Sequence, residues 1–431
     1  MIRLTIYVVR PGDSLYMIAK RFGVSPDEIY SENHLGDIPY LVVGQSLVIP
    51  TTETTYTVQS GDSLWSIARK FGVTTSGIIA LNGIANPHNL TPGTVLRIPQ
   101  KAKNYGYIET NGYIEPSTAQ KETATIDEVG EYLTYISPFS YQVTPNASII
   151  PLNVDTILGE IKKFRIAPLM VITNFANGTF STETADTILQ SDSLQTTLIN
   201  NMINVLNQKG FYGVNIDFER ISPQNRQNYN NFLRKVVAAL HPLKYVVSTA
   251  LAPKPSDYQT GAWHGAHDYK AHGEIVDFVI IMTYEWGWSG GPPYAVAPID
   301  LVEDVIKYAV SVIPSKKILM GVPLYGYDWL LPYMPGRWAK RISPQEALKM
   351  AAEHGAEIQF NTQTQSPTYK YFDSGNVEHE VWFEDARSIQ AKLLLVNKYN
   401  LRGVSYWLLG ISFPQNWLVL DSMYNIVKLV P

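Results

Sequence analysis

The stretch FYGVNIDFE at residues 211–219 alternates apolar residues with glycine and polar residues. Because neighbouring side chains of a strand point to opposite faces, the odd-numbered positions from 213 to 219 share one face and the apolar positions 214, 216 and 218 share the other. Asp217 and Glu219 then stand last along the polar face, about 6 to 7 Å apart by the rise of the backbone. The pattern predicts a strand that packs on helices through its apolar face and carries two carboxyl groups at its C-terminal end.

Seven further strand-like runs accompany this one, separated by helical patterns. The runs occupy residues 105–114, 131–139, 165–175, 245–253, 276–285, 317–326 and 402–409, and the helical patterns include 182–208, 224–240, 299–312 and 414–428. Eight strands alternating with helices over about 325 residues are typical of a (β/α)8 TIM barrel, with a doubly wound α/β sheet as the alternative. In a barrel, Asp217 and Glu219 lie at the C-terminal mouth, where barrel enzymes carry out their chemistry. There, the negative charge of one carboxylate raises the pKa of the other and keeps it protonated as a general acid.

The spacing of the last two strands predicts an insertion. The segment from Tyr325 to Arg402 is too long for one helical connection, and strand-like runs at 368–372 and 377–383 flank the turn residues Asp373 to Asn376. Such runs around a polar turn indicate a β-hairpin. We therefore expect an α+β insertion at about residues 328–384, forming one wall of the cleft, within a catalytic barrel of residues 101–431.

Two copies of a shorter unit precede the barrel. YVVRPGDSLYMIAKRFGVS at residues 7–25 recurs as YTVQSGDSLWSIARKFGVT at residues 56–74, and this register holds without a gap to Pro50 and Pro99. Each copy contains a short strand, a Gly-Asp-Ser turn suited to a helix N-cap, two helical patterns and a final strand. The repeat predicts two small βααβ domains, at residues 1–50 and 51–100.

The composition favours an uncharged partner. The 34 Lys and Arg residues and 38 Asp and Glu residues give a net charge of −4, which supplies no basic field for nucleic acid or an anionic membrane. Aromatic residues make up 12% of the chain, and such rings suit the flat apolar faces of sugars. The absence of cysteine excludes disulfides, thiolate metal sites and thiol nucleophiles. The N-terminus does not match a classical signal peptide, and no apolar run approaches the roughly 20 residues of a membrane span.

The repeated unit resembles the LysM family over both copies, through GDSL, IA, FGV and the final IP. This resemblance implies binding to polymers that contain N-acetylglucosamine, such as peptidoglycan or chitin. The side chains that we expect to serve mainly in helix capping are Asp13, Ser14, Asp62 and Ser63.

The strand at 211–219 resembles the DGxDxDxE signature of family 18 glycoside hydrolases. Gly213, Asp217 and Glu219 match it, whereas Tyr212 and Asn215 stand where that family usually has Asp. The resemblance covers residues 104–431 and implies retaining hydrolysis in which the substrate's own 2-acetamido oxygen is the nucleophile, one of the exceptions to the two-carboxylate scheme. It makes Glu219 the acid that protonates the leaving oxygen and later activates water.

The same resemblance implies roles for other residues. Asp217 orients the acetamido group and stabilises its positive charge, and Tyr284 of MTYE (282–285) donates a hydrogen bond to that group. The expected substrate-binding residues are Trp407, as the floor of the sugar site, Trp286, Glu285 and Tyr325. Core packing remains an alternative for Trp286, and a structural ion pair remains one for Glu285.

Asn215, on the same strand face as Asp217, is an amide where the family signature usually has a carboxylate. A neutral amide cannot share a proton with Asp217, so we expect Asp217 to stay anionic over a wider pH range. We expect activity to survive the departure because the acid Glu219 is present.

A histidine-rich loop raises the possibility of a zinc site. His264, His267 and His272 lie near Asp268, but their spacing lacks the helical i, i+4 logic of a zinc motif. We therefore expect neither a metal nor another cofactor.

Residues 263–293 give a narrower resemblance, to the cortex-fragment-lytic glucosaminidases of bacterial spores. It implies a spore-coat, cortex or cell-wall location and hydrolysis after N-acetylglucosamine in peptidoglycan. Muramic-δ-lactam has no free acetyl oxygen, so it cannot supply the internal nucleophile. No obligate protein partner is evident. The alternatives are a chitinase or endo-β-N-acetylglucosaminidase and, in another class, a non-catalytic wall-binding protein.

Overall fold

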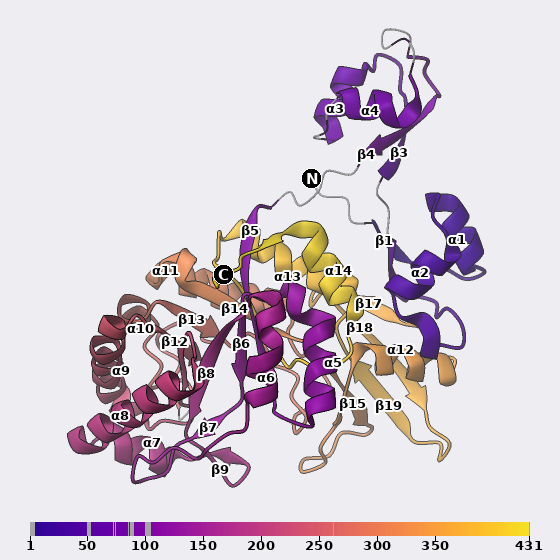
Figure 1. The fold of residues 1–431 in the computed structure, drawn as a ribbon. Helices are drawn as coiled ribbons and strands as arrows, with labels where there is room; N and C mark the ends of the chain where they lie inside the picture. Colours follow the sequence, from indigo (N-terminus) through magenta and orange to yellow (C-terminus); the bar gives the residue numbers. More distant parts are fainter. Residues whose placement is uncertain are drawn as a thin grey trace.

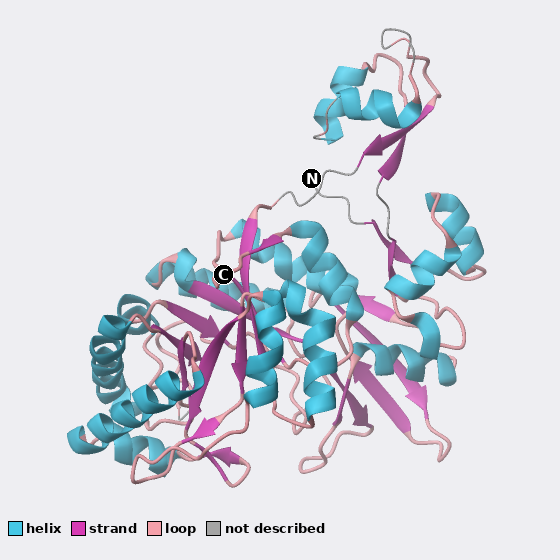
Figure 2. Ribbon diagram, in the orientation of Figure 1, coloured by secondary structure: helices cyan, strands magenta, loops and turns pink. Residues whose placement is uncertain are grey.

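A computed structural model describes residues 5–49, 53–71, 73, 75–84, 86, 90–99, 105–261 and 263–430. It contains a barrel with an inserted lobe and two small N-terminal domains (Figure 1). Helices lie outside the strands of the barrel (Figure 2).

Eight parallel strands form a closed ring, which confirms the expected TIM barrel and excludes the doubly wound sheet. The ring closes because β11 pairs with both β8 and β12. In chain order the strands are β5 (Tyr107–Ile114), β6 (Tyr135–Pro138), β8 (Ala167–Thr173), β11 (Gly213–Asp217), β12 (Val246–Leu251), β13 (Phe278–Ile281), β14 (Ile318–Pro323) and β20 (Gly403–Trp407). The main helices around them are α5 (Ala119–Val129), α6 (Asp155–Glu160), α7 (Thr182–Leu189), α8 (Asp192–Lys209), α9 (Arg226–Leu240), α10 (Tyr269–Ile275), α11 (Ile299–Val312), α13 (Ala386–Lys398) and α14 (Pro414–Met423).

Strand β11 has the two faces that its sequence predicts. Val214, Ile216 and Phe218 are fully buried in the main core, and Phe218 stacks on Phe232 of α9. Asn215, on the other face, points into the ring. The apolar face therefore holds the strand against the helices while the polar face serves the barrel interior.

Two predicted helices end differently from the expectation. The pattern at 182–208 forms two helices, α7 and α8, because Ser191 caps the second by accepting a hydrogen bond from the backbone N–H of Leu194. The helix predicted at 414–428 ends at Met423, and the chain continues as the short strand β21 (Asn425–Ile426), which pairs with β5.

The segment between β14 and α13 forms an α+β lobe. Its five-stranded antiparallel sheet has the order β16-β15-β19-β18-β17. The elements are β15 (Gly326–Leu330), β16 (Lys340–Ile342), α12 (Pro344–Glu353), β17 (Gln359–Asn361), β18 (Ser366–Phe372) and β19 (Glu378–Trp382). Strands β18 and β19 are the hairpin predicted around Asp373. The exact domain boundaries stay predictions.

The N-terminal domains have the predicted βααβ order. The first contains β1 (Thr5–Val8), α1 (Leu15–Phe22), α2 (Pro26–Glu32) and β2 (Ser46–Ile49), and the second contains β3 (Glu53–Thr57), α3 (Leu64–Phe71), α4 (Thr75–Asn82) and β4 (Val95–Pro99). Ser14 and Ser63 each accept a backbone hydrogen bond from the residue three positions on, as helix caps do. Asp13 and Asp62 instead accept hydrogen bonds from the hydroxyls of Tyr7 and Tyr56, at 2.6 and 2.7 Å, and tie the turn to the first strand.

The first small domain packs against two barrel helices. Gln415 of α14 donates to Asn33 Oδ1 at 3.1 Å and to the carbonyl of Ser46 at 2.8 Å, and Asn33 is completely buried. Arg387 of α13 donates to the carbonyl of Gly44 at 3.1 Å. These buried polar contacts fix the domain to the barrel.

The same domain also contacts the inserted lobe. The backbone N–H of Ile358 donates to the carbonyl of Val43 at 2.9 Å, and Gln345 of α12 donates to the carbonyl of His34 at 2.8 Å. The first domain thus bridges barrel and lobe, whereas the second is drawn apart from the barrel in Figure 1.

Gly44 and the equivalent Gly93 of the second domain provide a test of this packing. Both have positive φ, +84° and +90°, but a Cβ on Gly44 would lie 1.8 Å from the carbonyl oxygen of Ile358, whereas nothing lies within 4 Å of one on Gly93. Both Gly→Ala changes incur the backbone cost, and only Gly44→Ala adds overpacking, about 1 to 3 kcal/mol. Thermal unfolding is expected to show a lower midpoint for Gly44→Ala than for Gly93→Ala. Equal midpoints would contradict a stabilising contact.

Candidate active site

Glu219 lies two residues beyond the end of β11 and is held through its backbone. Its N–H donates to Asn174 Oδ1 at 3.0 Å, and Asn174 Nδ2 donates to the carbonyl of Glu219 at 2.8 Å. Its side chain accepts a hydrogen bond from the indole N–H of Trp263, which reaches Oε2 at 3.0 Å. The neighbouring strand and a distant loop together fix the orientation of this carboxyl group.

Burial raises the pKa of Glu219 to about 7, against the opposing effects of the Trp263 hydrogen bond and the positive charge of Arg220. The carboxyl group can therefore be protonated or ionised close to neutral pH. This is the range in which one group can act first as an acid and then as a base. Burial, rather than the charge of Asp217, is the main cause of the raised pKa.

Asp217 ends β11 and is 4% exposed. Its Oδ1 accepts no hydrogen bond from the described residues. Burial, and then the negative charge of Glu219, raise the pKa of Asp217 well above its usual range. The expectation that Asp217 stays anionic over a wide pH range is therefore wrong for this ligand-free structure, because it took no account of the desolvation of the carboxyl group.

Asn215 lies one step further down the same face and is completely buried. Its Oδ1 accepts from the hydroxyl of Tyr113 at 2.8 Å, and its Nδ2 donates to Ser248 Oγ at 3.0 Å. The amide is thus part of the polar interior of the barrel below Asp217. This environment suits a neutral side chain, since both ends of the amide have partners.

A cavity of about 780 Å³ opens in front of Glu219. The residues lining it are Phe175, Gly178, Thr179, Phe180, Glu219, Arg220, Pro253, Gln259, Trp263, His264, Tyr284, Glu285, Trp286 and Trp288. Phe175 and Phe180 come from the short hairpin β9 (Phe175–Ala176) and β10 (Thr179–Phe180). An acid surrounded by aromatic rings in an open cavity suits a sugar polymer.

The structure brings Tyr284 and Glu285 together with Glu219 around this cavity. Tyr284 is 8% exposed, and the charges of Asp217 and Glu219 are close enough to raise its pKa further after the main effect of burial. Glu285 Oε1 accepts hydrogen bonds from Tyr325 and, at 3.0 Å, from Tyr327. Tyr325 therefore orients Glu285 and does not itself line the cavity.

The tryptophans predicted for sugar binding have different positions. Trp286 lines the cavity, as expected for sugar binding, and it also packs on the main core, as the alternative of core packing predicts. Trp407 is half-buried, packs edge-on against Tyr113 and Phe139, and is not among the described residues lining the cavity. Its contact is with Tyr113, the partner of Asn215, so it supports the polar interior behind the cavity.

The histidine loop has structural contacts. His267 and His272 are buried, and burial lowers the pKa of His267 to about 4. His267 Nδ1 accepts from the backbone N–H of Ala252, and Nε2 faces the carbonyl of Phe218 at 3.0 Å. Across the described part of the chain, no group of three His, Asp or Glu side chains is arranged to hold a metal ion.

Sequence reasoning missed Trp263 and Asn174 as neighbours of Glu219. Asn174 lies near the end of the strand-like run at residues 165–175 and directly after β8, which pairs with β11. Because the barrel prediction makes these two strands neighbours, the sequence did contain a signal for the proximity of Asn174 to Glu219. Trp263 lies 44 residues after Glu219 in a loop, where no periodicity indicates what it contacts.

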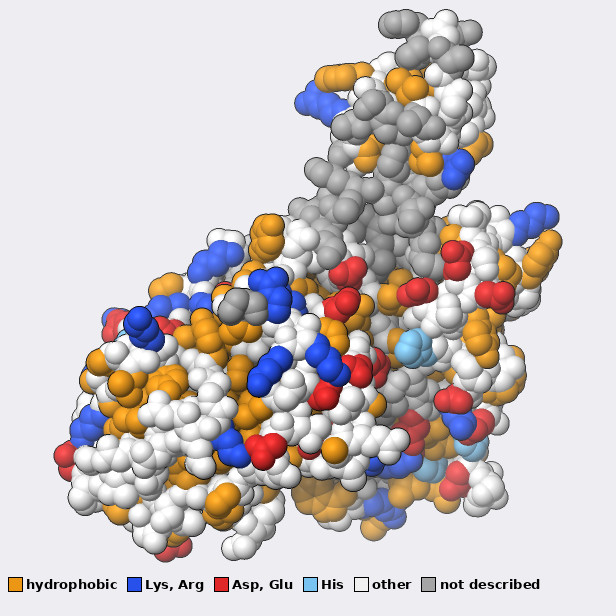
Figure 3. Space-filling model, viewed as in Figure 1, with side chains coloured by type: hydrophobic (Ala, Val, Ile, Leu, Met, Phe, Trp, Pro, Cys, Tyr) orange, Lys and Arg blue, Asp and Glu red, His pale blue; other side chains and the backbone are white. Residues whose placement is uncertain are grey.

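The molecular surface has no dominant sign of charge on the face shown in Figure 3, where basic and acidic side chains are both present between apolar ones. Within the described residues, no helix combines the length and apolar character needed to cross a bilayer.

Comparisons with known proteins extend over the whole chain. The family model "Glycosyl hydrolases family 18" matches residues 112–411, and the LysM domain model matches residues 7–50 and 56–99. The chain is 50% identical over 429 residues to the "Cortical fragment-lytic enzyme" of Bacillus subtilis, covering 99% of each chain.

Solved structures show the same relationship. The crystal structure of the spore cortex-lytic enzyme SleL of Bacillus megaterium has a TM-score of 0.92 and 43% identity, covering 99% of each chain. A chitinase from Chromobacterium violaceum has a TM-score of 0.68 and 26% identity, covering 73% of this chain and 98% of the other.

The barrel, the acidic end of β11 and the aromatic cavity agree with these matches. LysM and family 18 domains together indicate that the ligand is peptidoglycan or another polymer of N-acetylglucosamine. The chain belongs to glycosyl hydrolase family 18, carries two N-terminal LysM domains, and is a glycoside hydrolase.

Proposed function

We propose that this protein cleaves the β-1,4 bond after N-acetylglucosamine in spore-cortex peptidoglycan fragments, with retention of configuration. The observation that carries the proposal is Glu219, a buried carboxyl with a pKa near 7 that faces an aromatic cavity next to Asp217. The names of the Bacillus subtilis and Bacillus megaterium relatives, cortical fragment-lytic enzyme and spore cortex-lytic enzyme, support the choice of substrate.

In the first step, protonated Glu219 gives its proton to the glycosidic oxygen. The acetamido oxygen of the same N-acetylglucosamine forms a bond to C1 as the bond from C1 to the leaving oxygen breaks. Asp217 accepts a hydrogen bond from the acetamido N–H through the oxygen that has no partner among the described residues. The step uses Asp217 in its ionised form and Glu219 in its protonated form, so the pair carries one proton. The Asp217 carboxylate then offsets the positive charge of the cyclic intermediate, which in turn lowers the pKa of Asp217. The Tyr284 hydroxyl donates to the same acetamido group.

In the second step, ionised Glu219 takes a proton from water, whose oxygen attacks C1 and breaks the bond to the acetamido oxygen. Because each step inverts C1, the overall configuration is retained. Muramic-δ-lactam, whose nitrogen lies in a ring without a free acetyl oxygen, cannot take part in this way. The proposal therefore places N-acetylglucosamine at the cleaved bond and assigns the two LysM domains to the polymer, in the spore cortex or cell wall.

The pKa of Glu219 predicts the alkaline side of the pH profile. The first step needs the protonated acid, so kcat/KM should fall as pH rises through the pKa of about 7. Above it, the expected loss is about tenfold per pH unit. Initial rates on a soluble N-acetylglucosamine oligomer over a pH series measure this limb. A limb near pH 4.5, the usual carboxyl range, would contradict the assignment of the acid.

A chitinase is the second candidate, because the chemistry of the acetamido group is the same in chitin and the Chromobacterium violaceum chitinase shares the fold. Digestion of cortex fragments and chitin oligomers in parallel, followed by mass analysis of the products, distinguishes the two candidates. Cortex fragments are expected to give the higher kcat/KM, and a clear preference for chitin would contradict the proposed substrate.

A further inference from the structure

The loop at residues 252–268 brings Trp263 to the acid. Its indole N–H lies 3.0 Å from Glu219 Oε2, and the ring also lines the cavity. An indole N–H is a donor only. Whichever oxygen it contacts must therefore act as an acceptor.

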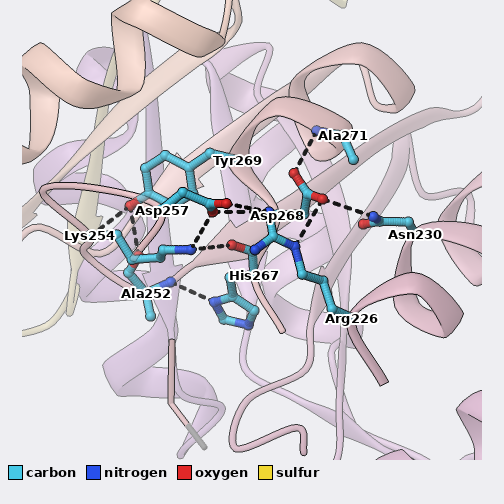
Figure 4. Close-up of polar contacts among 9 residues, drawn as sticks. All are labelled: Arg226, Asn230, Ala252, Lys254, Asp257, His267, Asp268, Tyr269 and Ala271. Carbon is cyan, nitrogen blue, oxygen red and sulfur yellow. Dashed lines mark hydrogen bonds and ion pairs between the residues drawn. The ribbon is translucent and has the colours of Figure 1, made fainter. Parts of the chain in front are cut away.

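A network of hydrogen bonds and ion pairs, centred on the buried side chain of Lys254, holds the base of this loop (Figure 4). The side chain of Lys254 is fully buried, and its ammonium group donates to the carbonyl of His267 at 3.0 Å and pairs with Asp257 at 3.1 Å. Arg226 of α9 pairs with Asp257 at 2.9 Å and with Asp268 at 3.0 Å. The two ends of the loop are thereby tied to each other and to the barrel.

His267 links this network to the strand that carries the acid. Because the backbone N–H of Ala252 donates to Nδ1, the proton of the neutral ring is on Nε2, which donates to the carbonyl of Phe218. Phe218 immediately precedes Glu219. Burial and the nearby charge of Lys254 lower the pKa of His267 and so keep the imidazole ring neutral. The loop and the backbone of the acid are therefore held at a fixed separation.

We propose that Trp263 is a positioning residue that keeps Glu219 Oε2 as an acceptor and so assigns the transferable proton to Oε1. This inference rests on the proposed role of Glu219 as the acid. In the protonated acid, a proton on Oε2 would face the indole N–H and displace it, whereas a proton on Oε1 leaves the hydrogen bond intact. The same N–H stabilises the ionised form needed in the second step.

Other groups also act on the charge of Glu219. Five titratable or charged residues interact electrostatically with Glu219. Arg220 lowers the pKa of Glu219, and the charge of Glu219 raises the pKa of Asp217, Tyr113, Tyr229 and Tyr284. None of them is changed by substitution of Trp263. Removal of the indole donor alone should therefore raise the pKa of Glu219, since it removes a hydrogen bond that favours the anion.

The test is Trp263→Phe, read as the alkaline limb of kcat/KM on a soluble N-acetylglucosamine oligomer. The limb is expected to move upward by about one pH unit, and kcat is expected to fall more than KM rises. Trp288→Phe is the matched control: it removes an indole from the same cavity, where its ring pairs with Trp338, so the limb should stay in place although KM is free to change. A limb that does not move in Trp263→Phe, or that moves downward, would overturn the inference.

A second variant separates the hydrogen bond from the packing of the ring. Replacing Trp263 by 3-benzothienylalanine keeps the bicyclic shape and substitutes sulfur for the N–H group. The same upward shift is expected, and an unchanged limb would again overturn the role of the donor. The titration of Glu219 in the ligand-free protein, followed by carbon-13 NMR of labelled glutamate, gives the shift without turnover. Failure of the proposed function would instead appear as a native protein with no hydrolysis while this NMR shift persists.

Discussion

Replacing Glu219 with glutamine is expected to lower kcat/KM on cortex fragments by about 10² to 10⁴-fold, the range that a general acid contributes. The amide has nearly the shape of the carboxyl group and can still accept the hydrogen bond from Trp263. It cannot donate a proton to the leaving oxygen or remove one from water. Both steps therefore fail while the fold and the cavity persist. Initial rates on purified fragments measure the loss.

The control for this change is Glu128→Gln, which alters an exposed carboxyl on the outer helix α5. It should have kcat/KM within about twofold of the native protein, because surface substitutions away from specific features have small effects. Unaltered turnover in Glu219→Gln would show that another group is the acid. Absence of turnover in the native protein would favour the non-catalytic wall-binding alternative.

Replacing Asp217 with asparagine is expected to lower kcat by about 10² to 10³-fold with a smaller effect on KM. A charge acting on the transition state is worth this much when it is held in a buried site. Asp217 is buried two residues before Glu219, its Oδ1 has no partner among the described residues, and it lies behind the described residues that line the cavity. The proposal assigns this free oxygen to the acetamido group of a bound sugar. An asparagine offers an acceptor but no negative charge for the cyclic cation.

Inhibition by an analogue of the intermediate tests whether the loss in Asp217→Asn comes from the missing negative charge. A thiazoline analogue of the cyclic intermediate, which carries a positive charge when protonated, should inhibit the native protein strongly and Asp217→Asn much more weakly. Thermal unfolding of the variant checks that the barrel is intact. Equal inhibition of both proteins would contradict the role of Asp217.

The strand at 211–219 and the repeat at 7–25 and 56–74 allowed most of the architecture to be predicted. Their alternating and helical periods depend on local sequence, and the structure has the barrel, the hairpin around Asp373 and both βααβ domains. The break between α7 and α8 was missed because a capping serine interrupts an otherwise continuous apolar pattern. The periodicity of apolar residues therefore predicts the type of an element well and the residues at which it ends less well.

The candidate site could be predicted only in part. Glu219, Tyr284, Glu285 and Trp286 do line one cavity, as strand ends of a barrel should. The raised pKa of Asp217 and the contact of Trp407 with Tyr113 depend on burial and on side-chain packing between distant segments, which the sequence does not express. The role of Trp263 depends on the loop fixed by Lys254 and His267, whose partners are likewise distant. Catalytic side chains at strand ends were therefore easier to predict than the groups that tune them.

The chemistry of the cut end tests the central claim most directly. Purified cortex fragments would be digested with the native protein, reduced with borohydride and identified by mass spectrometry. Cleavage through the acetamido group of N-acetylglucosamine predicts new products that end in reduced N-acetylglucosamine and that are absent with Glu219→Gln. New ends of reduced muramic acid would contradict the account.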